Sequence, residues 1–425
     1  MIKQFVTVAI GLASFSFVLG QGTNPSQFDK AEQVQLNTIT TAVPFIGITP
    51  DSRSGAMGDI GAGISPDANS LYWNTSKLAF AEKDFEIAVS YSPWLQRLAK
   101  DIHLSYLSGY KKIGERHAVG GSLRYFSLGN ITFTDVQGKK VRDFTPSELE
   151  LTVGYAFQLS RVFSIGLNGK YIFSNLTGGT TVQGANTKAG QAGAADLSFS
   201  YYDKEKKWFG KKAEVGVGLT ISNIGNKITY SQNGATDFLP TNLRLGTAVK
   251  THIDEYNAIT FGVDVNKLLV PTPQVMVNGN DGNNYWIGKD NNVGVITGIF
   301  QSFGDAPGRA LLDENGEAIV ENGEVQIKKN SRFGEEIREI NFGVGLEYWY
   351  NEVFAVRTGY FHEDRSKGNR QYLTFGIGLQ YNVFGLDISY LAAFSRLNPL
   401  ANTLRFTLRF VFDKKSSVAK SADEE

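Results

Sequence analysis

The stretch Thr403-Leu404-Arg405-Phe406-Thr407-Leu408-Arg409-Phe410-Val411-Phe412 alternates apolar and polar side chains with a period of two over most of its length. Successive side chains of a β-strand point to opposite faces, so one face carries leucine and phenylalanine while the other carries Arg405, Thr407 and Arg409. Such a strand fits between lipid and water. The same alternation recurs along most of the chain after residue 85, which predicts an all-β protein, a closed transmembrane antiparallel β-barrel.

The period-two runs predict about fourteen strands, an even number as in bacterial outer-membrane barrels. We expect these strands at residues 85–91, 102–110, 117–126, 148–158, 162–173, 194–202, 213–222, 241–250, 257–265, 340–349, 353–361, 371–380, 385–393 and 403–412.

The connections between the predicted strands alternate between short and long. Leu159–Arg161 and Tyr350–Glu352 are examples of the short set. Bacterial outer-membrane barrels have tight periplasmic turns and longer extracellular loops, so this alternation predicts a bacterial outer-membrane protein with both termini in the periplasm. The connection Asp203–Lys212 is longer than the other short ones and fits this arrangement least well.

Four successive parts of the chain are predicted from its sequence. Residues 1–20 contain one positive charge and an apolar run shorter than a membrane-spanning helix, the pattern of a cleaved signal peptide. Residues 21–84 are too long for a simple leader and are expected to form an N-terminal extension and plug. The barrel occupies 85–412, with 266–339 as a long extracellular loop, and 413–425 has the composition of a disordered periplasmic tail.

Glycine triplets recur inside the predicted strands, at Val215–Leu219, Phe342–Leu346 and Phe375–Leu379. Their glycines all fall on the lumen face. Nucleotide-binding glycine motifs lie between a strand and a helix, so these triplets do not fit that function. Small residues on the lumen face instead make room for a plug of short helices and loops inside the barrel.

The composition also limits the chemistry that the chain can perform. The 42 basic residues balance the 42 acidic ones, which argues against a nucleic-acid partner, and the absence of cysteine removes thiolate chemistry. The four histidines lack metal-ligand spacing, and no serine-nucleophile motif occurs. We therefore expect no enzyme activity, no catalytic residue, no cofactor and no metal site.

Two polar stretches offer weaker alternatives to that expectation. Phe361–Arg365 combines an acid, a base and a cation, but a solvated turn is its ordinary explanation. Asp281–Asn292 is rich in oxygen ligands, yet it lacks the spacing and the terminal glutamate of an EF-hand, which favours a flexible loop over a calcium site.

The predicted plug contains two runs, Ile48–Gly61 and Ser65–Asn74, that resemble the N-terminal signature of the PorV (also called LptO) family of type IX secretion. The later segments Gly368–Arg370, Tyr381–Asp387 and Asn402–Phe406 also resemble that family. The resemblance covers nearly the whole chain after the predicted signal peptide. The PorV family is itself similar in fold to the FadL fatty-acid transporters.

The resemblance implies a fourteen-stranded barrel with an N-terminal plug. It also implies a shuttle in the outer-membrane lipid, which accepts secreted cargo by its folded C-terminal signal domain from the type IX translocon barrel. The shuttle then delivers this cargo to a cell-surface attachment complex. One departure from the FadL-like pattern is visible, because Asn74-Thr75-Ser76 stands where those proteins tend to have Asn-Pro-Ala.

The long predicted loop contains the apolar run Val293–Gly304, and exposed apolar residues in such a run are typical of a partner-binding site. In the alternative interpretation these side chains fold back over the barrel mouth and pack on other loops. The residues that we expect to contact the translocon or cargo are Ile296, Ile299, Phe300 and Phe303.

A second group of candidate partner-binding residues is basic and consists of Arg365, Lys367 and Arg370. These side chains suit an anionic lipopolysaccharide or an acidic partner. The alternative is a solvated loop face without a ligand.

The candidate plug residues are Asp51, Arg53, Asp59, Trp73 and Asn74. Charges away from bulk water are tolerated mainly when they are paired, so the three charged residues are expected to seat the plug against lumen charges such as Arg405 and Arg409. The alternative is that they line a water-filled passage.

Two other classes of barrel compete with the secretion hypothesis. A FadL-type transporter of small hydrophobic molecules needs an apolar pocket from an extracellular groove into the lumen, and the sequence has no clear apolar stripe facing inward. A general porin leaves its lumen open and needs no plug.

Overall fold

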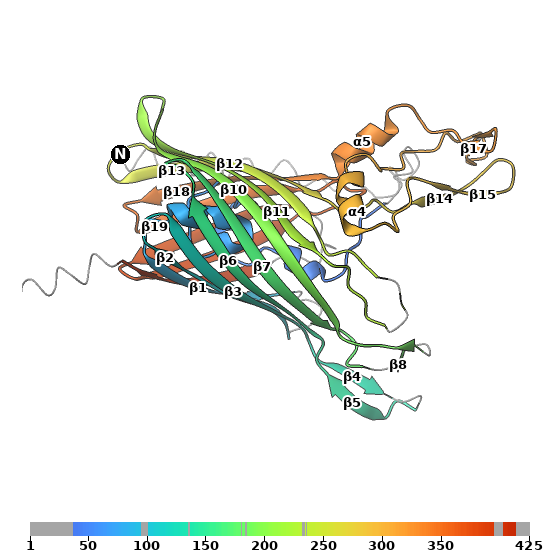
Figure 1. Cartoon of the computed structure of the whole chain (residues 1–425), viewed down its shortest axis with the longest axis horizontal. Coiled ribbons are helices and arrows are strands. Elements are labelled where there is room, and N and C mark those ends of the chain that lie inside the picture. The colour runs from blue at the N-terminus through green and yellow to red at the C-terminus, as the bar shows by residue number, and fades with distance from the viewer. Residues whose placement is uncertain are drawn as a thin grey trace, which may run out of the picture. The chain divides into compact units, whose positions relative to one another are not determined.

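The computed structural model describes residues 37–94, 101–134, 137–179, 181–182, 185–231, 234, 236–394 and 403–413. Fourteen long antiparallel strands form one closed barrel, in which strands adjacent in the chain pair and the first strand also pairs with the last (Figure 1). The predicted fourteen-stranded barrel is confirmed. The predicted signal peptide, residues 21–36 of the extension and residues 414–425 of the tail lie outside the described residues.

The barrel strands are β1 (Phe85–Pro93), β2 (Ile102–Ile113), β3 (His117–Leu128), β6 (Ser147–Gln158), β7 (Phe163–Asn175), β10 (Gly190–Trp208), β11 (Lys211–Gly225), β12 (Asn242–His252), β13 (Asn257–Leu268), β18 (Ile340–Tyr350), β19 (Phe354–His362), β20 (Gln371–Tyr381), β21 (Phe384–Ala393) and β22 (Leu404–Phe412). Each predicted strand corresponds to one of these.

The last strand, β22, has the two faces that its sequence predicts. Leu404 and Phe406 are 40% and 38% exposed on the outer wall, whereas Arg405 and Arg409 are buried in the lumen. Lipid can cover the outer apolar side chains, and the arginines find partners inside. Aromatic side chains such as Phe412, which packs on Phe85 with ring centroids 5.6 Å apart, mark the end of the wall, as aromatic girdles do in outer-membrane barrels.

The two ends of the barrel differ in their connections. We call the end with tight turns the short-turn end and the opposite end the long-loop end. β10 and β11 extend farther than predicted, and only Phe209 and Gly210 connect them, both with positive φ. That backbone suits a two-residue hairpin turn. The poorly fitting connection Asp203–Lys212 is thus a strand hairpin with a tight turn, so it belongs to the short set.

The long-loop end contains short elements that the alternation did not predict, because each is too short to show a period. They are β4 (Ile131–Thr134), β5 (Lys140–Phe144), β8 (Thr181–Val182), β9 (Ala185–Asn186), β14 (Val275–Asn278), β15 (Asn284–Ile287), α4 (Val295–Gln301), β16 (Val320–Glu321), β17 (Glu324–Val325) and α5 (Ser331–Arg338). The elements from β14 to α5 all lie between β13 and β18 and extend beyond the barrel wall (Figure 1).

Before β1, the described part of the chain contains four short helices that fill the lumen: η3 (Pro44–Gly47), α2 (Ser52–Gly55), α3 (Ser70–Trp73) and η4 (Thr75–Phe80). They lie inside the ring of strands (blue in Figure 1) and are buried, as expected for a plug. The described chain begins at the long-loop end, where the Asn37 amide donates to the Ser366 carbonyl. It then follows the lumen to the start of β1 at the short-turn end. No helix among the described residues is long and apolar enough to span a membrane.

Candidate functional site

The plug packs directly on the backbone of the barrel at the predicted glycine positions. A side chain at Gly216 or Gly218 would collide with the carbonyl groups of Gly63 or Ala62 in the plug. Gly345 likewise faces the carbonyl of Met57. Glycine allows this close approach because it has no Cβ. The glycine triplets therefore make room for the plug.

A chain of alternating charges connects the plug to the barrel. Arg53 of α2 pairs with Asp67 of the plug at 3.1 Å and with Glu347 of β18 at 2.9 Å. Glu347 also accepts from Arg357 Nε at 2.7 Å, and Arg357 Nη1 pairs with Asp387 at 2.7 Å. The side chains of Glu347, Arg357 and Asp387 are at most 1% exposed. Buried charges need such partners, since an unpaired one carries a large desolvation penalty.

The charge chain continues through Asp387 to Arg409 of β22, whose Nε lies 2.9 Å from the second carboxylate oxygen. Arg409 in turn lies 3.6 Å from Glu86 of β1. Arg409 is predicted to pair with the plug, but its ion-pair partners are Asp387 and Glu86 of the barrel wall. These distant strands and the plug thus share one network, which we call the lumen charge network: Glu86, Asp67, Arg53, Glu347, Arg357, Asp387 and Arg409.

The other candidate plug residues take different roles. Asp59 pairs at 3.4 Å with Arg405, which is one of the two lumen arginines predicted to seat the plug. Asp51 has a local role instead, because it accepts from the Ser54 amide at the start of α2 and from Trp73 Nε1 at 2.7 Å. Asp51 therefore links two plug helices rather than the plug and the wall.

Trp73 and Asn74 lie where the plug meets β10 and β12. The Arg244 guanidinium of β12 lies over the Trp73 ring, 4.5 Å from its centroid. Asn74 Nδ2 donates to the Phe199 carbonyl at 3.0 Å, and its Oδ1 accepts from the Ser76 amide at the start of η4. Ser76 stands where the FadL-like pattern has alanine, and its Oγ forms a hydrogen bond with Ser200 Oγ of β10 at 2.7 Å that alanine could not form.

The predicted apolar run lies on α4 and just after it. Ile296, Phe300 and Phe303 are 61%, 74% and 55% exposed, and Ile299 is half-buried. Ile296, Phe300 and Phe303 therefore leave most of their side chains accessible, whereas the buried Gly298 of the same helix lies against Pro271 and Phe238. Apolar side chains exposed together on a loop are typical of a partner-binding surface.

A second exposed apolar face lies on α5, which the sequence analysis missed. Phe333 is 69% exposed and Ile337 is 51% exposed, and their spacing of four residues places them on one face of the helix. That spacing was the available signal. The segment after α4 contacts α5, since the Ala306 amide donates to Glu336, and both helices belong to the long-loop extension (Figure 1). We call Ile296, Phe300, Phe303, Phe333 and Ile337 the loop apolar surface.

The three predicted basic residues differ in position. Arg365 is exposed. Arg370 pairs with Glu363 at 2.7 Å and keeps 44% of its side chain exposed. Lys367 is buried, and its ammonium lies 2.7 Å from Glu335 and 3.0 Å from Glu339. The expectation that Lys367 contacts an external ligand is corrected here, because its charge already neutralises carboxylates inside the loop.

Two aspartates of the long loop have opposite environments. Asp281, at the tip of the β14–β15 hairpin, accepts from Tyr285 Oη at 2.6 Å and from Asn283, and these hydrogen bonds lower the pKa of its carboxyl. Asp305, after α4, is 1% exposed, and burial raises the pKa of its carboxyl. The polar stretch Asp281–Asn292 is thus satisfied by its own turn, whereas Asp305 belongs to a buried cluster.

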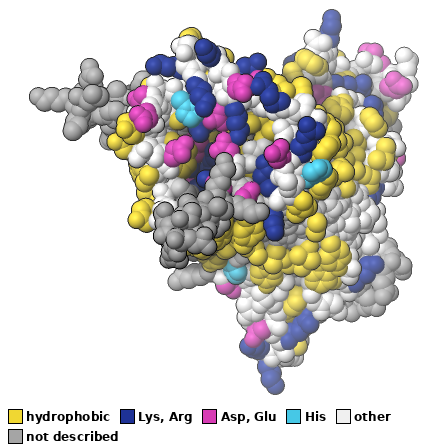
Figure 2. All heavy atoms as spheres, turned by 60° about the vertical axis from the view of Figure 1, so that its left-hand side comes forward, with side chains coloured by type: hydrophobic (Ala, Val, Ile, Leu, Met, Phe, Trp, Pro, Cys, Tyr) yellow, Lys and Arg dark blue, Asp and Glu magenta, His cyan; other side chains and the backbone are white. Residues whose placement is uncertain are grey.

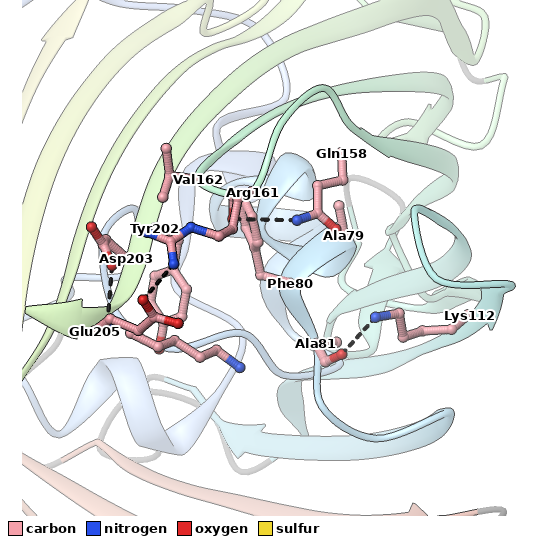
Figure 3. Close-up of a pocket in the computed structure, with 11 residues that line it drawn as sticks. Ala79, Phe80, Ala81, Lys112, Gln158, Arg161, Val162, Tyr202, Asp203 and Glu205 are labelled. Atoms are coloured by element: carbon pink, nitrogen blue, oxygen red, sulfur yellow. Dashed lines mark hydrogen bonds and ion pairs between the residues drawn. The ribbon is translucent and has the colours of Figure 1, made fainter.

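The short-turn end is rich in charged side chains beside the hydrophobic wall (Figure 2). A pocket of about 280 Å³ opens there between the end of the plug, the strands β2, β6 and β10, and the turn between β6 and β7 (Figure 3). Its charged groups are already paired: Lys112 donates to the Ala81 carbonyl at 2.9 Å, Lys204 pairs with Glu82 at 2.6 Å, and Arg161 pairs with Glu205. The pocket therefore offers little free charge for a ligand.

Comparison with solved structures finds other barrels at low sequence identity. The Pseudomonas putida toluene transporter TodX is 11% identical, with 89% of this chain and 98% of that chain covered and a TM-score of 0.44. The Ralstonia pickettii toluene transporter TbuX is 12% identical, with 85% and 96% covered and a TM-score of 0.42. A Pseudomonas aeruginosa FadL homologue is 10% identical, with 89% and 99% covered and a TM-score of 0.40. The search of curated proteins found no match.

The family comparison concerns the plug and the first nine of the fourteen barrel strands. The model of the type IX secretion system protein PorV matches residues 30–275, more than half of the chain. This range includes the two plug runs, Ile48–Gly61 and Ser65–Asn74, on which the resemblance was first based. The barrel fold fits the outer membrane. The chain belongs to the PorV family of type IX secretion system proteins.

Proposed function

We propose that this protein receives secreted cargo at the type IX translocon, binds its folded C-terminal signal domain, and delivers it to a cell-surface attachment complex. In this proposal the long-loop end faces the cell exterior and the short-turn end faces the periplasm. In this proposal the protein acts by binding, and no side chain has a catalytic role. Family membership supports the secretion role in general.

The observation that carries the proposal is the exposure of the loop apolar surface. Phe300 and Phe333, on two different helices, are 74% and 69% exposed. Large aromatic side chains at the centre of an interface supply much of its binding energy once water is excluded. These rings are in contact with water in the isolated chain, and a partner that covers α4 and α5 together would bury them.

The lumen is filled by the plug and the lumen charge network, which favours the proposed binding role over a transport role. The plug packs on lumen glycines, and the lumen charge network fills the space between α2 and the strands β18, β19, β21 and β22. A FadL-type transporter of hydrophobic molecules needs an apolar route through the lumen, whereas Arg357 and Glu347 are fully buried ions. A binding role at the long loops requires no such route.

The proposal is tested by affinity purification of the tagged protein from gently solubilised outer membranes, with co-purifying proteins identified by mass spectrometry. The variant replaces Ile296, Phe300 and Phe303 by serine. The matched control replaces Trp286, which is 64% exposed on β15 in the same loop, by serine.

The proposal predicts that the wild type and the Trp286→Ser control recover a large barrel protein and secreted proteins that share a C-terminal domain. The triple variant should lose both while its own yield stays unchanged. Recovery of the barrel alone with bound lipid or fatty acid, and no protein partner for any variant, would contradict the proposal and favour the transporter.

A further inference from the structure

Three carboxylates meet beneath α4 and α5, although Asp305 is distant in the sequence from the other two. Asp305 lies shortly after α4, Glu336 lies in α5, and Glu339 follows α5 directly. Each offers an oxygen within 4.8 Å of the others. Asp305 and Glu339 are buried, and Glu336 is half-buried, so the cluster is accessible to solvent from one side.

One buried oxygen of the cluster has no hydrogen-bond partner among the described residues. Asp305 Oδ2 accepts from the Thr272 amide at 3.1 Å, and Oδ1 is the unpartnered oxygen. Glu336 accepts from the Ala306 amide at 2.9 Å, and Glu339 accepts from Thr272 Oγ1 at 2.8 Å. A carboxylate offers about four lone-pair sites, so Asp305 and Glu336 retain acceptor capacity toward the cluster. A buried, unpartnered carboxylate oxygen is costly unless a cation or donor satisfies it.

The charges around the cluster are not balanced. Lys267 lies 3.1 Å from Glu336 and 2.6 Å from Glu339, and Lys367 bridges Glu339 and Glu335. Four carboxylates therefore share two ammonium groups, which leaves two negative charges. A single divalent cation would neutralise this excess, whereas a third lysine or a water molecule would not.

We propose that Asp305, Glu336 and Glu339 bind a Ca²⁺ ion that joins α4 to α5. Calcium–oxygen distances of about 2.3–2.6 Å allow three oxygens that lie within 4.8 Å of one another to contact one ion. Mg²⁺ usually retains several waters and uses one or two carboxylates, so three carboxylates in a largely buried site favour Ca²⁺. Lys267 and Lys367 neutralise the remaining charge from the barrel side. The spacing of the sequence did not indicate this site, because the fold alone brings Asp305 next to α5.

The ion would hold the two helices that carry the loop apolar surface. Asp305 belongs to the segment that leaves α4, and Glu336 belongs to the same helix as Phe333 and Ile337. Joining them restricts the movement of one helix against the other. Calcium binding therefore orders the surface before any partner arrives, and it does not depend on the proposed secretion role.

Calcium binding is measured by isothermal titration of Ca²⁺ into the full-length, chelator-treated protein in detergent. The test variant is Asp305→Asn, whose amide oxygen can still accept from Thr272 while the negative charge is lost. The matched control is Asp281→Asn, an exposed acid of the same loop. Heat-modifiable migration of the barrel in gel electrophoresis checks that both variants fold.

We expect one Ca²⁺ per wild-type chain, with an affinity of about 10⁻⁴ to 10⁻³ M as in extracellular modules. Asp305→Asn should weaken binding at least about tenfold, and Asp281→Asn should not change it. Calcium should also slow hydrogen exchange across residues 295–339 in the wild type and the control only. The absence of binding at millimolar Ca²⁺, or equal binding by Asp305→Asn, would overturn the proposal.

Discussion

The lumen and the long-loop end differ in which side chains they bury: the lumen buries paired charges, whereas the long-loop end leaves large apolar side chains exposed. In the lumen, Arg357 is fully buried and paired with two carboxylates, and glycines bring the backbone of the plug against the wall. At the long-loop end, Phe300 and Phe333 stay exposed although an apolar side chain gains by leaving water. The charges of the first region are paired within this chain, whereas in the proposed function a partner covers the second. Substitutions in the two regions should therefore affect different properties.

The largest effect on stability is expected from Arg357→Ala. This change leaves Glu347 and Asp387 with one fewer cation in the lumen, and breaking such a buried pair costs about 3–5 kcal/mol. Guanidinium titration in detergent measures the free energy of unfolding. The control is Arg365→Ala, an exposed arginine of a loop, which should change this free energy by less than about 0.5 kcal/mol. Equal effects of the two changes would show that the lumen charge network does not stabilise the fold.

A smaller effect is expected from Gly216→Val, which forces a side chain against the plug carbonyl of Gly63. Overpacking of this kind costs about 1–3 kcal/mol, and it should displace the plug and raise the ion conductance of the barrel in planar bilayers. Gly169→Val is the matched control, since a Cβ at Gly169 meets no atom within 4 Å. Unchanged conductance with Gly216→Val would contradict tight seating of the plug.

For the long-loop end we expect a loss of binding without a loss of stability. Phe300→Ser removes an exposed ring, so the free energy of unfolding should change by less than about 0.5 kcal/mol. Loss of a central aromatic contact costs about 2 kcal/mol of binding, or roughly a thirtyfold rise in Kd for the purified translocon barrel. Binding to the surface-immobilised translocon barrel measures the Kd of the wild type and that of the variant. A variant that unfolds but binds normally when folded would place Phe300 in the core of the loop instead.

The smallest effect is expected at the short-turn end, from Arg161→Ala. Arg161 and Glu205 form an ion pair whose side chains are 69% and 71% exposed. Solvent screens such an exposed pair, so thermal unfolding should hardly change. If Arg161→Ala lowered the stability as much as Arg357→Ala, the exposed ion pair would matter as much as the buried one, which would contradict the comparison.

The sequence predicted the barrel wall well because its signal is local. Each strand repeats the alternation of β22, in which Leu404 and Phe406 face outward and Arg405 faces inward. The short hairpins of the loops were missed, since two to five residues cannot show a period.

Partners distant in the chain could not be predicted. Arg53 was expected to seat the plug, but its partner Glu347 is 294 residues away, and no local pattern identifies it. Lys367 was placed on an external face because Glu335 and Glu339 meet it only in the fold. By contrast, the four-residue spacing of Phe333 and Ile337 was readable in the sequence and was overlooked.

The most direct test of the central claim is photo-crosslinking in living cells, with a photoreactive phenylalanine at Phe300. The same residue at Leu167, which is 53% exposed on the barrel wall, is the control for contacts in the lipid. The proposed function predicts that Phe300 crosslinks to the type IX translocon or to secreted proteins with the C-terminal signal domain, and that Leu167 does not. Crosslinks from Phe300 only to other residues of this chain, or equal partner crosslinks from both positions, would contradict it.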